Sequence, residues 1–555
     1  MTGLALFVLA VYTVSLLYIT VYCLLQFNLL YHYKKSVNPT DHPVSFAKLA
    51  PKREAASCKP MLVGANGGGD FASSPAVLLS GVEVAARLPP ELDSAAPPRP
   101  SSLPPLLPYY PFVTVQLPIY NELYVIARLI DACTKFDYPK DRFEIHILDD
   151  STDETIDIVA AKVAEYQAKG FRIEQIIRGQ REGFKAGALR DAMPRARGEF
   201  IAIFDADFVP DPAFLQRTVP HFADPEVGVV QTRWEHINED YSIITRLQAL
   251  QLNVHFTVEQ VGRMNGGHLL QFNGTAGVWR AKTIAAGGGW QPDTLTEDLD
   301  LSIRSQLAGY KIHFLEKVGS PAELPVEMNS FKSQQHRWMK GGAETAKKML
   351  PAVWRSDLTL WHKIHSTAHL LGSTIFLFVF LCGVFSVPLL FLFGELTALG
   401  LSKNIFAVFL AGLLSVIGIY YTANVKSIAN KEKSFGKSVL KFAILFPLFL
   451  ALSMGLSLHN TVAVLQGYRG KKSPFVRTPK FNINTIKDKL TAKKYISGKF
   501  NLITVGEGLL CLYFLFAVAG AFYLQNTTFI FFHGLLALGY GAIFFYSVKH
   551  LKFAG

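Results

Sequence analysis

Residues 143–150 have the sequence FEIHILDD, and residues 200–207 have the sequence FIAIFDAD. Each is a short apolar run that ends in two carboxylates, a pattern typical of a buried strand followed by a polar loop. FVTVQL at 112–117 and VGVVQ at 227–231 are two more apolar runs, and helical stretches such as 154–169 separate them. Strands that alternate with helices favour an α/β domain whose parallel sheet is covered on both faces.

Hydrophobic segments flank this domain on both sides. Half of the 555 residues are hydrophobic, and many lie in runs long enough to cross a bilayer. The first run, from Gly3 to about Leu30, lacks the basic n-region, short h-region and cleavage site of a signal peptide, which favours an uncleaved anchor. Lys34 and Lys35 follow it, so the middle of the chain is predicted to be cytosolic. We expect a bacterial inner-membrane protein or, in a eukaryote, a Golgi protein.

The C-terminal hydrophobic region raises a question of topology. Candidate spans are 369–393, 405–421, 439–465, 502–524 and 528–546. Two basic loops, 426–441 and 469–499, lie between spans, and both are predicted to be cytosolic. A single crossing between these loops cannot place both on one side. Either the segment from Pro447 to Asn460 is re-entrant or interfacial, or one span is miscounted.

The chain is therefore predicted to have four parts. These are an anchor (1–35), a linker (36–111), a cytosolic α/β domain (112–353) and C-terminal transmembrane helices (354–555). Within the linker, 57–108 is rich in Ala, Pro, Gly and Ser, a composition that cannot bury a core. The net charge of +12 lies largely in loops between spans, so it gives no basis for a nucleic-acid partner.

The five cysteines argue against several kinds of site. They are Cys23, Cys58, Cys133, Cys382 and Cys511. No two of them are close together in the sequence, which is unlike zinc ligation, a disulfide framework or a CxxC redox site. Three of them lie in hydrophobic or helical surroundings and are expected to be packing residues.

Polar clusters follow the predicted strands, where open α/β sheets bind ligands. The first cluster contains Pro118, Tyr120, Asn121 and Glu122. Asn121 is also a favoured helix cap, so a capping role is the alternative. The second cluster begins with Asp149 and Asp150. One of these acids can cap the next helix, and a contact with a nucleotide ribose or base suits the other.

Two further clusters are acidic. Asp205 and Asp207 are two residues apart, so on an extended chain they point to one face, roughly 6–7 Å apart. A hard divalent cation bound to substrate phosphate would relieve their repulsion, whereas an Asp-rich turn is the alternative. The motif TED at 296–298 opens a predicted helix, 299–307. It is either an ordinary N-terminal cap or the source of a general base for an acceptor hydroxyl.

Two basic or aromatic signals complete the set. The run QQHRW at 334–338 is compatible with an amphipathic helix of mixed polarity. However, Trp338 can stack on a sugar ring, while Gln334 and Arg337 can bind hydroxyls and a diphosphate. Lys185, in the run GFKAG, is a candidate for the positive charge that a departing diphosphate requires.

The order of these motifs resembles that of family 2 glycosyltransferases of the membrane-embedded, cellulose-synthase-like type. The matching residues are Asp150 (D), Asp205 and Asp207 (DxD), Thr296, Glu297 and Asp298 (TED), and Gln334, Arg337 and Trp338 (QxxRW). The resemblance covers about 112–350, and it is closest to the branch of glucomannan and xyloglucan-backbone synthases and their bacterial relatives. The run QFNGTAG, with Phe272, Asn273 and Gly274, is similar to the acceptor-side segment of that branch. FVRTPK at 475–480 is similar to the gating-loop motif of cellulose synthases but departs from it by an Arg and a Pro.

The resemblance implies a GT-A fold and an inverting single displacement that uses Mg²⁺ or Mn²⁺. Asp207 would ligate the metal, and Asp205 would help to hold metal and nucleotide. Asp150 and the 118–122 loop would hold the nucleoside. Asp298 would deprotonate the acceptor, and the metal would stabilise the departing diphosphate. The QxxRW residues would line the acceptor and diphosphate end of the site.

Three functions remain open from the sequence. The first is a processive β-glycan synthase that uses UDP-glucose or GDP-mannose and guides its product between the spans. The second is a transferase that adds one or a few sugars to a lipid acceptor. The third is a non-catalytic nucleotide-binding subunit or a transporter, which would be expected to lack a carboxylate or to have repeats. In the first case, His459 and Asn460 would face the path of the sugar chain. The alternative is that they lie in a contact between two helices.

Overall fold

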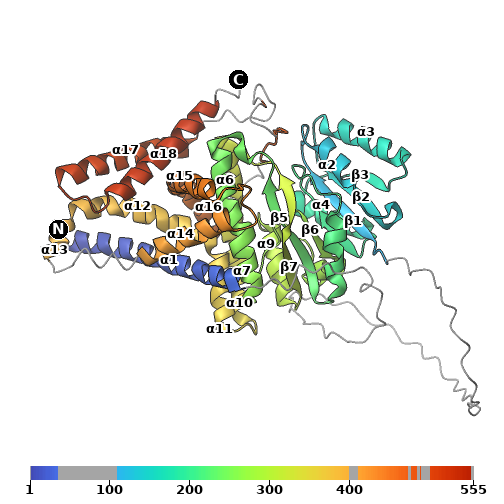
Figure 1. Ribbon diagram of the computed structural model, residues 1–555, viewed down its shortest axis with the longest axis horizontal. Helices are drawn as coiled ribbons and strands as arrows, with labels where there is room; N and C mark the ends of the chain where they lie inside the picture. The colour runs from blue at the N-terminus through green and yellow to red at the C-terminus, as the bar shows by residue number, and fades with distance from the viewer. Residues whose placement is uncertain are drawn as a thin grey trace, which may run out of the picture.

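The computed structural model describes residues 2–35, 109–398, 410–472, 477–483, 488 and 501–551. The Ala/Pro/Gly-rich segment 57–108, Cys58, Phe475, Val476 and most of the second basic loop lie outside the described residues. Figure 1 shows a bundle of long helices at one end of the molecule and an α/β domain at the other. The bundle contains the N-terminal helix and the C-terminal helices, and the α/β domain comes from the sequence between them.

A seven-stranded sheet in the order β3-β2-β1-β4-β6-β5-β7 forms the centre of the α/β domain. The strands are β1 (Val113–Ile119), β2 (Phe143–Asp149), β3 (Ile173–Ile177), β4 (Phe200–Ile203), β5 (Val227–His236), β6 (Gly277–Arg280) and β7 (Lys311–Ala322). Strands β1 to β4 are parallel, as predicted, and β5 is parallel to β7. Strand β6, which was not among the predicted strands, is antiparallel to β4 and β5, so the sheet is mixed. The connection from β5 to β6 begins and ends at the carboxyl ends of the parallel strands, so β6 runs in the opposite direction to its neighbours.

Helices cover both faces of this sheet. This is expected, because strands that are apolar along their whole length must be buried on both faces. They are α2 (Ile126–Cys133), α3 (Thr155–Ala168), α4 (Phe184–Ala192), α5 (Phe214–Thr218), α8 (Ala281–Ala286) and α9 (Glu297–Leu307). Short 3₁₀ turns are η2 (Lys140–Arg142), η3 (Met193–Arg195), η4 (Val219–Ala223) and η5 (Glu239–Tyr241). Along β4, Phe200 and Ala202 enter one buried cluster while Ile201 and Ile203 enter the other. The two-residue alternation of a strand thus gives the sheet a core on each face.

Two long helical segments join the domain to the bundle. One consists of α6 (Ile243–Val254), the π-turn η6 (His255–Glu259) and α7 (Gln260–Asn265). The other consists of α10 (Met328–Arg355) and α11 (Leu360–Leu370). Helix α7 packs directly on α1. The two backbones are so close at Gly262 that a Cβ atom there would collide with the carbonyl oxygen of Leu29. The absent side chain lets these backbones approach closely and fixes α1 against the domain.

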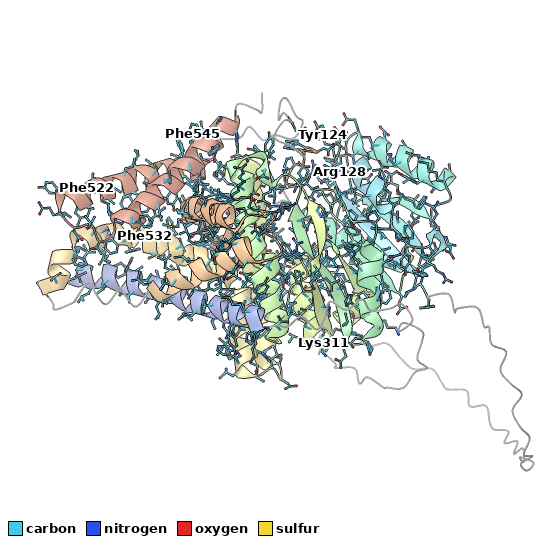
Figure 2. All side chains as sticks on the ribbon, in the orientation of Figure 1. Tyr124, Arg128, Lys311, Phe522, Phe532 and Phe545 are labelled. Carbon is cyan, nitrogen blue, oxygen red and sulfur yellow. The ribbon has the colours of Figure 1, made fainter. Side chains whose placement is uncertain are left out.

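Among the described residues, five helices are long and apolar enough to cross a membrane: 3–35, 372–391, 435–455, 502–523 and 530–550. The helices of the bundle are α1 (Thr2–Lys35), η7 (Gly372–Thr374), α12 (Ile375–Phe391), α13 (Phe393–Ala398), α14 (Leu410–Tyr421), η9 (Thr422–Lys426), α15 (Phe435–Gly455), α16 (Ser457–Tyr468), α17 (Leu502–Tyr523) and α18 (Ile530–Leu551). Phe522 and Phe545 lie on the outside of the bundle (Figure 2) and are 67% and 57% exposed. Such large exposed apolar side chains suit contact with lipid.

The predicted span 439–465 is two helices. The hydroxyl of Ser457, at the start of α16, lies 2.8 Å from the hydroxyl of Tyr540 in the middle of α18. The outer ends of both helices adjoin the α/β domain, since Lys441 Nζ lies 3.0 Å from Glu239 Oε1 and Lys340 Nζ lies 2.5 Å from the backbone oxygen of Lys471. Helices α15 and α16 therefore form a hairpin whose two outer ends both lie on the domain side.

His459 lies between helices. Its Nε2 atom is 2.9 Å from the backbone oxygen of Lys332 in α10, and the neighbouring Asn460 is fully buried. This geometry agrees with the helix-contact alternative. The cysteine prediction also agrees with the structure, because Cys23, Cys133 and Cys382 are buried free thiols.

A buried ion pair ties α10 to α17. Lys332 Nζ lies 2.8 Å from Glu507 Oε2, and both side chains are buried. We expect Glu507→Ala to destabilise the protein by about 3–5 kcal/mol, because Lys332 would keep a buried, unpaired charge. The apparent unfolding temperature in a fixed detergent measures this effect. Replacing both residues by Met should restore most of the loss, and an unchanged unfolding temperature in Glu507→Ala would contradict the account.

Candidate active site

A cavity of about 990 Å³ extends from the carboxyl ends of the strands to the helices of the bundle. Acidic side chains line its sheet end: Glu122, Asp150, Asp205, Asp207, Glu297 and Asp298. Residues of α1, α12, α14 and α18 line its other end, for example Ile19, Val379 and Phe532. The predicted motifs thus meet at one cavity, and the same cavity reaches the bundle.

The two acids of the DxD motif each hold a lysine. Lys185 Nζ lies 2.5 Å from Asp205 Oδ1 and 2.8 Å from the backbone oxygen of Gly274. Lys480 Nζ lies 2.6 Å from Asp207 Oδ2. Burial raises the pKa of Asp205, and the ammonium group of Lys185 opposes this shift. Each carboxylate of the motif thus has a lysine ammonium group beside it.

This donor set fits a hard divalent cation that is shared with a phosphate. No group of three or more His, Cys, Asp or Glu side chains that could hold a metal ion occurs within the described residues. Two carboxylates alone would leave coordination positions for the oxygens of a diphosphate, which is how Mg²⁺ is commonly bound. Asp205 and Asp207 are the residues that would hold Mg²⁺ or Mn²⁺ here.

Asp298 lies in the first turn of α9 and faces the cavity. Its Oδ1 accepts a hydrogen bond from the backbone N–H of Leu299 (2.9 Å). Its Oδ2 faces Gly274, where an added Cβ atom would lie only 3.1 Å away. Burial, and then the neighbouring charge of Glu297, raise the pKa of Asp298 to about 7. A carboxylate with a pKa near the working pH suits a general base.

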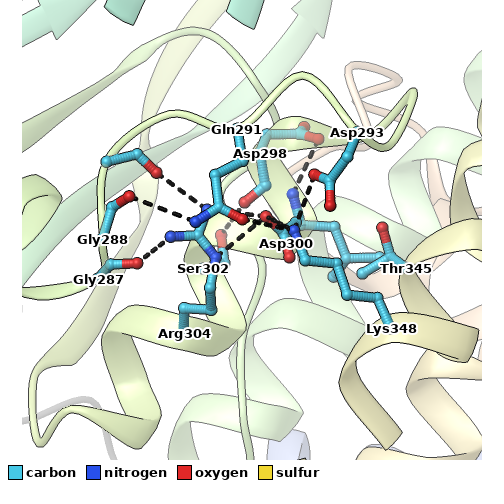
Figure 3. A network of polar contacts seen from close by, with 12 residues as sticks. Gly287, Gly288, Gln291, Asp293, Asp298, Asp300, Ser302, Arg304, Thr345 and Lys348 are labelled. Atoms are coloured by element: carbon cyan, nitrogen blue, oxygen red, sulfur yellow. Dashed lines mark hydrogen bonds and ion pairs between the residues drawn. The ribbon is translucent and has the colours of Figure 1, made fainter. Parts of the chain in front are cut away.

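Behind Asp298, a second acid fixes α9 to α10 (Figure 3). Asp300 is fully buried, and its Oδ2 accepts hydrogen bonds from Arg304 Nε (3.0 Å) and Lys348 Nζ (3.1 Å). Lys348, on α10, also donates to Asp293 Oδ1 (2.8 Å). Because α10 carries the QxxRW residues, this network sets the position of Asp298 relative to them. In the sequence, the only signal for Asp300 is that it is an acid two positions after the TED motif.

We expect Asp300→Asn to lower kcat by about 100-fold, because a displacement of about 1 Å at a catalytic group has an effect of this size. The affinity for the donor nucleotide should change little. Asp293→Asn is a matched control, since Asp293 bonds the same lysine but is 55% exposed and lies outside α9. Equal kcat values for Asp300→Asn and Asp293→Asn would contradict a positioning role.

Two arginines that the sequence patterns did not single out lie beside Asp150 and Tyr120. Arg178 forms a bidentate pair with Asp150, at 2.9 Å (Nε–Oδ1) and 2.5 Å (Nη2–Oδ2). The guanidinium of Arg181 lies 3.5 Å from the centre of the Tyr120 ring. Asp150 is thus held in place by an arginine, and Tyr120 has a cation on one face. In the sequence, the run RGQRE, which directly precedes GFKAG, was the signal that could have identified both arginines.

Two predicted site residues need correction. The amide oxygen of Asn121 accepts from the backbone N–H of Thr152 (2.8 Å), and Asn121 is not among the residues that line the cavity. It joins two loops and caps no helix, since α2 begins only at Ile126. Phe272 is fully buried against Trp279, with ring centres 5.3 Å apart, so its side chain cannot contact an acceptor.

The QxxRW residues and the run after α7 form the other wall. Gln334, Arg337 and Trp338 line the cavity, as do Asn273 and Gly274. Arg337 Nη2 donates to Thr478 Oγ1 (2.9 Å). Burial lowers the pKa of the Arg337 guanidinium, and the acids Asp205 and Glu297 oppose this effect. A diphosphate in the cavity would therefore meet a buried cation.

The described residues 477–483 lie over the sheet end of the cavity. Arg477 forms a bidentate pair with Glu122, at 2.9 Å and 2.7 Å. Arg128 Nη1 donates to Asn482 Oδ1 (2.6 Å), and Figure 2 shows Arg128 and Tyr124 together at this edge of the domain. The segment that is similar to a gating loop is thus held by two ion pairs. Arg477 pairs with Glu122 of the predicted donor loop, and Lys480 pairs with Asp207.

Two family models match the chain. The model "Glycosyl transferase family 2" matches residues 114–282, and "Glycosyl transferase family group 2" matches residues 200–456. Together they span 114–456, which is more than half of the 555 residues. The chain belongs to glycosyltransferase family 2. With the DxD motif at the carboxyl end of β4, membership of this family confirms the predicted GT-A fold.

The relatives confirm the predicted branch. Glucomannan 4-beta-mannosyltransferase 1 of Oryza sativa subsp. japonica is 40% identical over 297 residues, which is 52% of this chain and 57% of the relative. Glucomannan 4-beta-mannosyltransferase 9 of Arabidopsis thaliana is 38% identical over 292 residues, 51% of this chain and 55% of the relative. This family 2 glycosyltransferase thus spans little more than half the length of these relatives.

Among solved structures, the chain is similar to the mannosyltransferase PcManGT from Pyrobaculum calidifontis in complex with GDP-Man and Mn²⁺. The TM-score is 0.44 and the identity 22%, over 58% of this chain and 89% of that chain. It is also similar to TarS of S. aureus, with a TM-score of 0.32 and 16% identity over 64% of this chain and 54% of that chain.

Proposed function

We propose that this chain is an inverting, metal-dependent hexosyltransferase that transfers a hexose from a nucleotide sugar to a growing β-glycan at the membrane. The observation that carries the proposal is the position of Asp298. It faces the same cavity as the Asp205 and Asp207 pair, and burial and Glu297 raise its pKa to about 7. A base and a cation-binding acid pair at one cavity are the parts that a single displacement needs.

Each residue has a defined part in the proposed reaction. Asp298 takes the proton from an acceptor hydroxyl as that oxygen attacks C1 of the hexose. The bond from C1 to the diphosphate oxygen breaks in the same step, with inversion at C1. Lys185 and Arg337 stabilise the negative charge that the diphosphate gains. Asp205 and Asp207 would hold a divalent cation, which would supply Lewis-acid stabilisation of the same charge.

The donor we propose is GDP-mannose. The named relatives are glucomannan 4-beta-mannosyltransferases, and they are 40% and 38% identical to this chain over about half of its length. Arg181 stacks on Tyr120 beside Asp150, which gives the nucleoside end a cationic and an aromatic surface for a base. UDP-glucose is the second donor to test, because glucose and mannose differ at one hydroxyl.

The continuation of the cavity favours a growing glycan as the acceptor. Its far end is lined by residues of the bundle helices α1, α12, α14, α15 and α18, and the aromatic residues Phe376, Tyr420 and Phe529 also line it. Aromatic faces are common partners of sugar rings, whereas a single transfer would not need a path of this extent. We place the catalytic domain in the cytosol and the product path in the bilayer, in line with the charges that follow α1.

The test is an assay of the purified chain in lipid nanodiscs with Mg²⁺ or Mn²⁺. Labelled GDP-mannose and UDP-glucose are offered separately, and the product is sized. A long product from GDP-mannose supports the proposal. A short product linked to lipid favours a transferase that adds one or a few sugars, and no transfer from either donor contradicts the proposal.

A further inference from the structure

A cluster of polar side chains lies in the cavity wall on the membrane side of Asp298. We call Tyr22, Gln26, His255, Glu259, Arg263 and His369 the polar cluster. They come from α1, η6, α7 and α11, and all of them line the cavity. Polar and ionisable residues at such positions are costly, and they commonly mark a substrate path.

The polar cluster is joined to the reacting end of the site by hydrogen bonds. The side-chain Nδ2–H of Asn273 donates to His255 Nε2 (2.8 Å), so the proton of the ring lies on Nδ1. That Nδ1–H then donates to Glu259 Oε2, 3.0 Å away. Since Asn273 precedes Gly274, which faces Asp298, the cluster begins beside the residue that would bind the reacting hydroxyl.

Three polar atoms of the cluster have no hydrogen-bond partner among the residues that the structure describes. They are Gln26 Oε1, Arg263 Nη1 and His369 Nε2, and all three are buried. An unsatisfied buried polar atom costs about 1–3 kcal/mol. A ligand in the cavity that offers both donors and acceptors would remove this cost. The three atoms include an acceptor, a donor and a ring nitrogen that can be either.

The charges of the cluster balance. Burial alone would raise the pKa of Glu259, but Arg263 and the hydrogen bond from His255 outweigh it and lower the pKa to about 2. Burial lowers the pKa of His369 well below its usual value, so this ring is neutral. Arg263 Nη2 lies 3.3 Å from Glu259 Oε2, so the positive charge of Arg263 and the negative charge of Glu259 cancel. A wall with no net charge and mixed hydrogen-bonding groups suits a neutral polyhydroxyl compound better than a phosphate.

We propose that the polar cluster is a hexose-binding subsite that holds the acceptor at a ring beyond the one that receives the new sugar. The inference rests on the proposed function and extends it. Gln26 and Arg263 bind hydroxyls of the bound ring, and His369 accepts from or donates to a third. The ring can belong to a glycan or to the headgroup of a glycolipid, since both present the same chemistry.

The test compares Gln26→Leu and Arg263→Gln with the wild type in nanodiscs, without glycoside detergents, which would compete for the site. Arg246→Gln is the matched control, because Arg246 lies on α6, is 41% exposed and does not line the cavity. Calorimetry measures binding of a β-1,4-linked mannose hexamer and, separately, of an alkyl β-mannoside. Product length from GDP-mannose is the second readout.

We expect both cluster variants to bind the hexamer at least about 10-fold more weakly, a loss of about 1.4 kcal/mol, and to make shorter products. Gln26→Leu should keep or raise the unfolding temperature, because it removes an unpaired buried oxygen. A weakened affinity for the alkyl mannoside alone would identify a glycolipid as the source of the ring. Wild-type affinity for both probes in both variants would overturn the inference.

Failure of the proposed function is a separate result. If the wild type transfers no hexose from either donor, the catalytic proposal fails, while the binding comparison still decides whether the cluster binds a hexose. If the wild type transfers hexose and the variants match it in affinity and product length, only the subsite is wrong. A marked loss of thermal stability in Gln26→Leu would also overturn the inference, since Gln26 would then be a structural residue.

Discussion

Asp298→Asn is expected to lower the rate of hexose transfer by about 10²–10⁴-fold, the range that general-base catalysis contributes. The amide has the shape of the carboxylate but cannot take the proton of the acceptor hydroxyl. Donor binding should stay close to that of the wild type, because Asp298 is not one of the proposed metal ligands. The measurement is the initial rate of product formation together with the affinity for the donor nucleotide. Normal turnover in this variant would remove Asp298 from the mechanism.

The same residue predicts the pH dependence of the wild type. Burial and Glu297 raise the pKa of Asp298 to about 7, so below this pH the group is protonated and cannot act as a base. The value of kcat/KM should therefore rise with pH through about 7. Glu297→Gln removes one of the two causes and should move the inflection to lower pH. A profile that is flat across neutrality would argue against Asp298 as the base.

Asp207→Asn is expected to lower kcat/KM by roughly 10²–10³-fold, or about 3–4 kcal/mol of transition-state stabilisation. The variant loses one of the two carboxylates that would hold the cation, and Lys480 loses its ion-pair partner. Mn²⁺ titration followed by electron paramagnetic resonance, with the nucleotide present, should show weaker binding. Asp157→Asn, an exposed acid on α3, is the control. Unchanged Mn²⁺ affinity in Asp207→Asn would assign the metal to other residues.

Much of the active site could be predicted because its acids follow apolar strands. The pattern of FEIHILDD and FIAIFDAD places Asp150 and the DxD pair at one edge of a parallel sheet, and the structure has them there. Side-chain direction within a loop was harder to predict. Phe272 and Asn273 are neighbours, yet one is buried in the core and the other lines the cavity. Asn121, in a left-handed conformation (φ 57°), bonds a second loop.

Contacts between distant elements could not be predicted from sequence spacing. Asp300 meets Lys348 only because α9 packs on α10, and Lys480 meets Asp207 although 273 positions separate them in the sequence. Glu259 and Gln26 line one wall because α7 packs on α1 at Gly262. Hydropathy likewise could not separate a span from the hairpin of α15 and α16, since both are apolar over a similar length.

The most direct test of the central claim is the anomeric configuration of the product. Labelled GDP-α-mannose is converted by the wild type, and the product is treated with an endo-β-1,4-mannanase and, separately, with an α-mannosidase. A single displacement with Asp298 as the base predicts that the β-specific enzyme releases the label and that the α-specific enzyme does not. Label released only by the α-mannosidase would mean retention at C1 and would contradict the account.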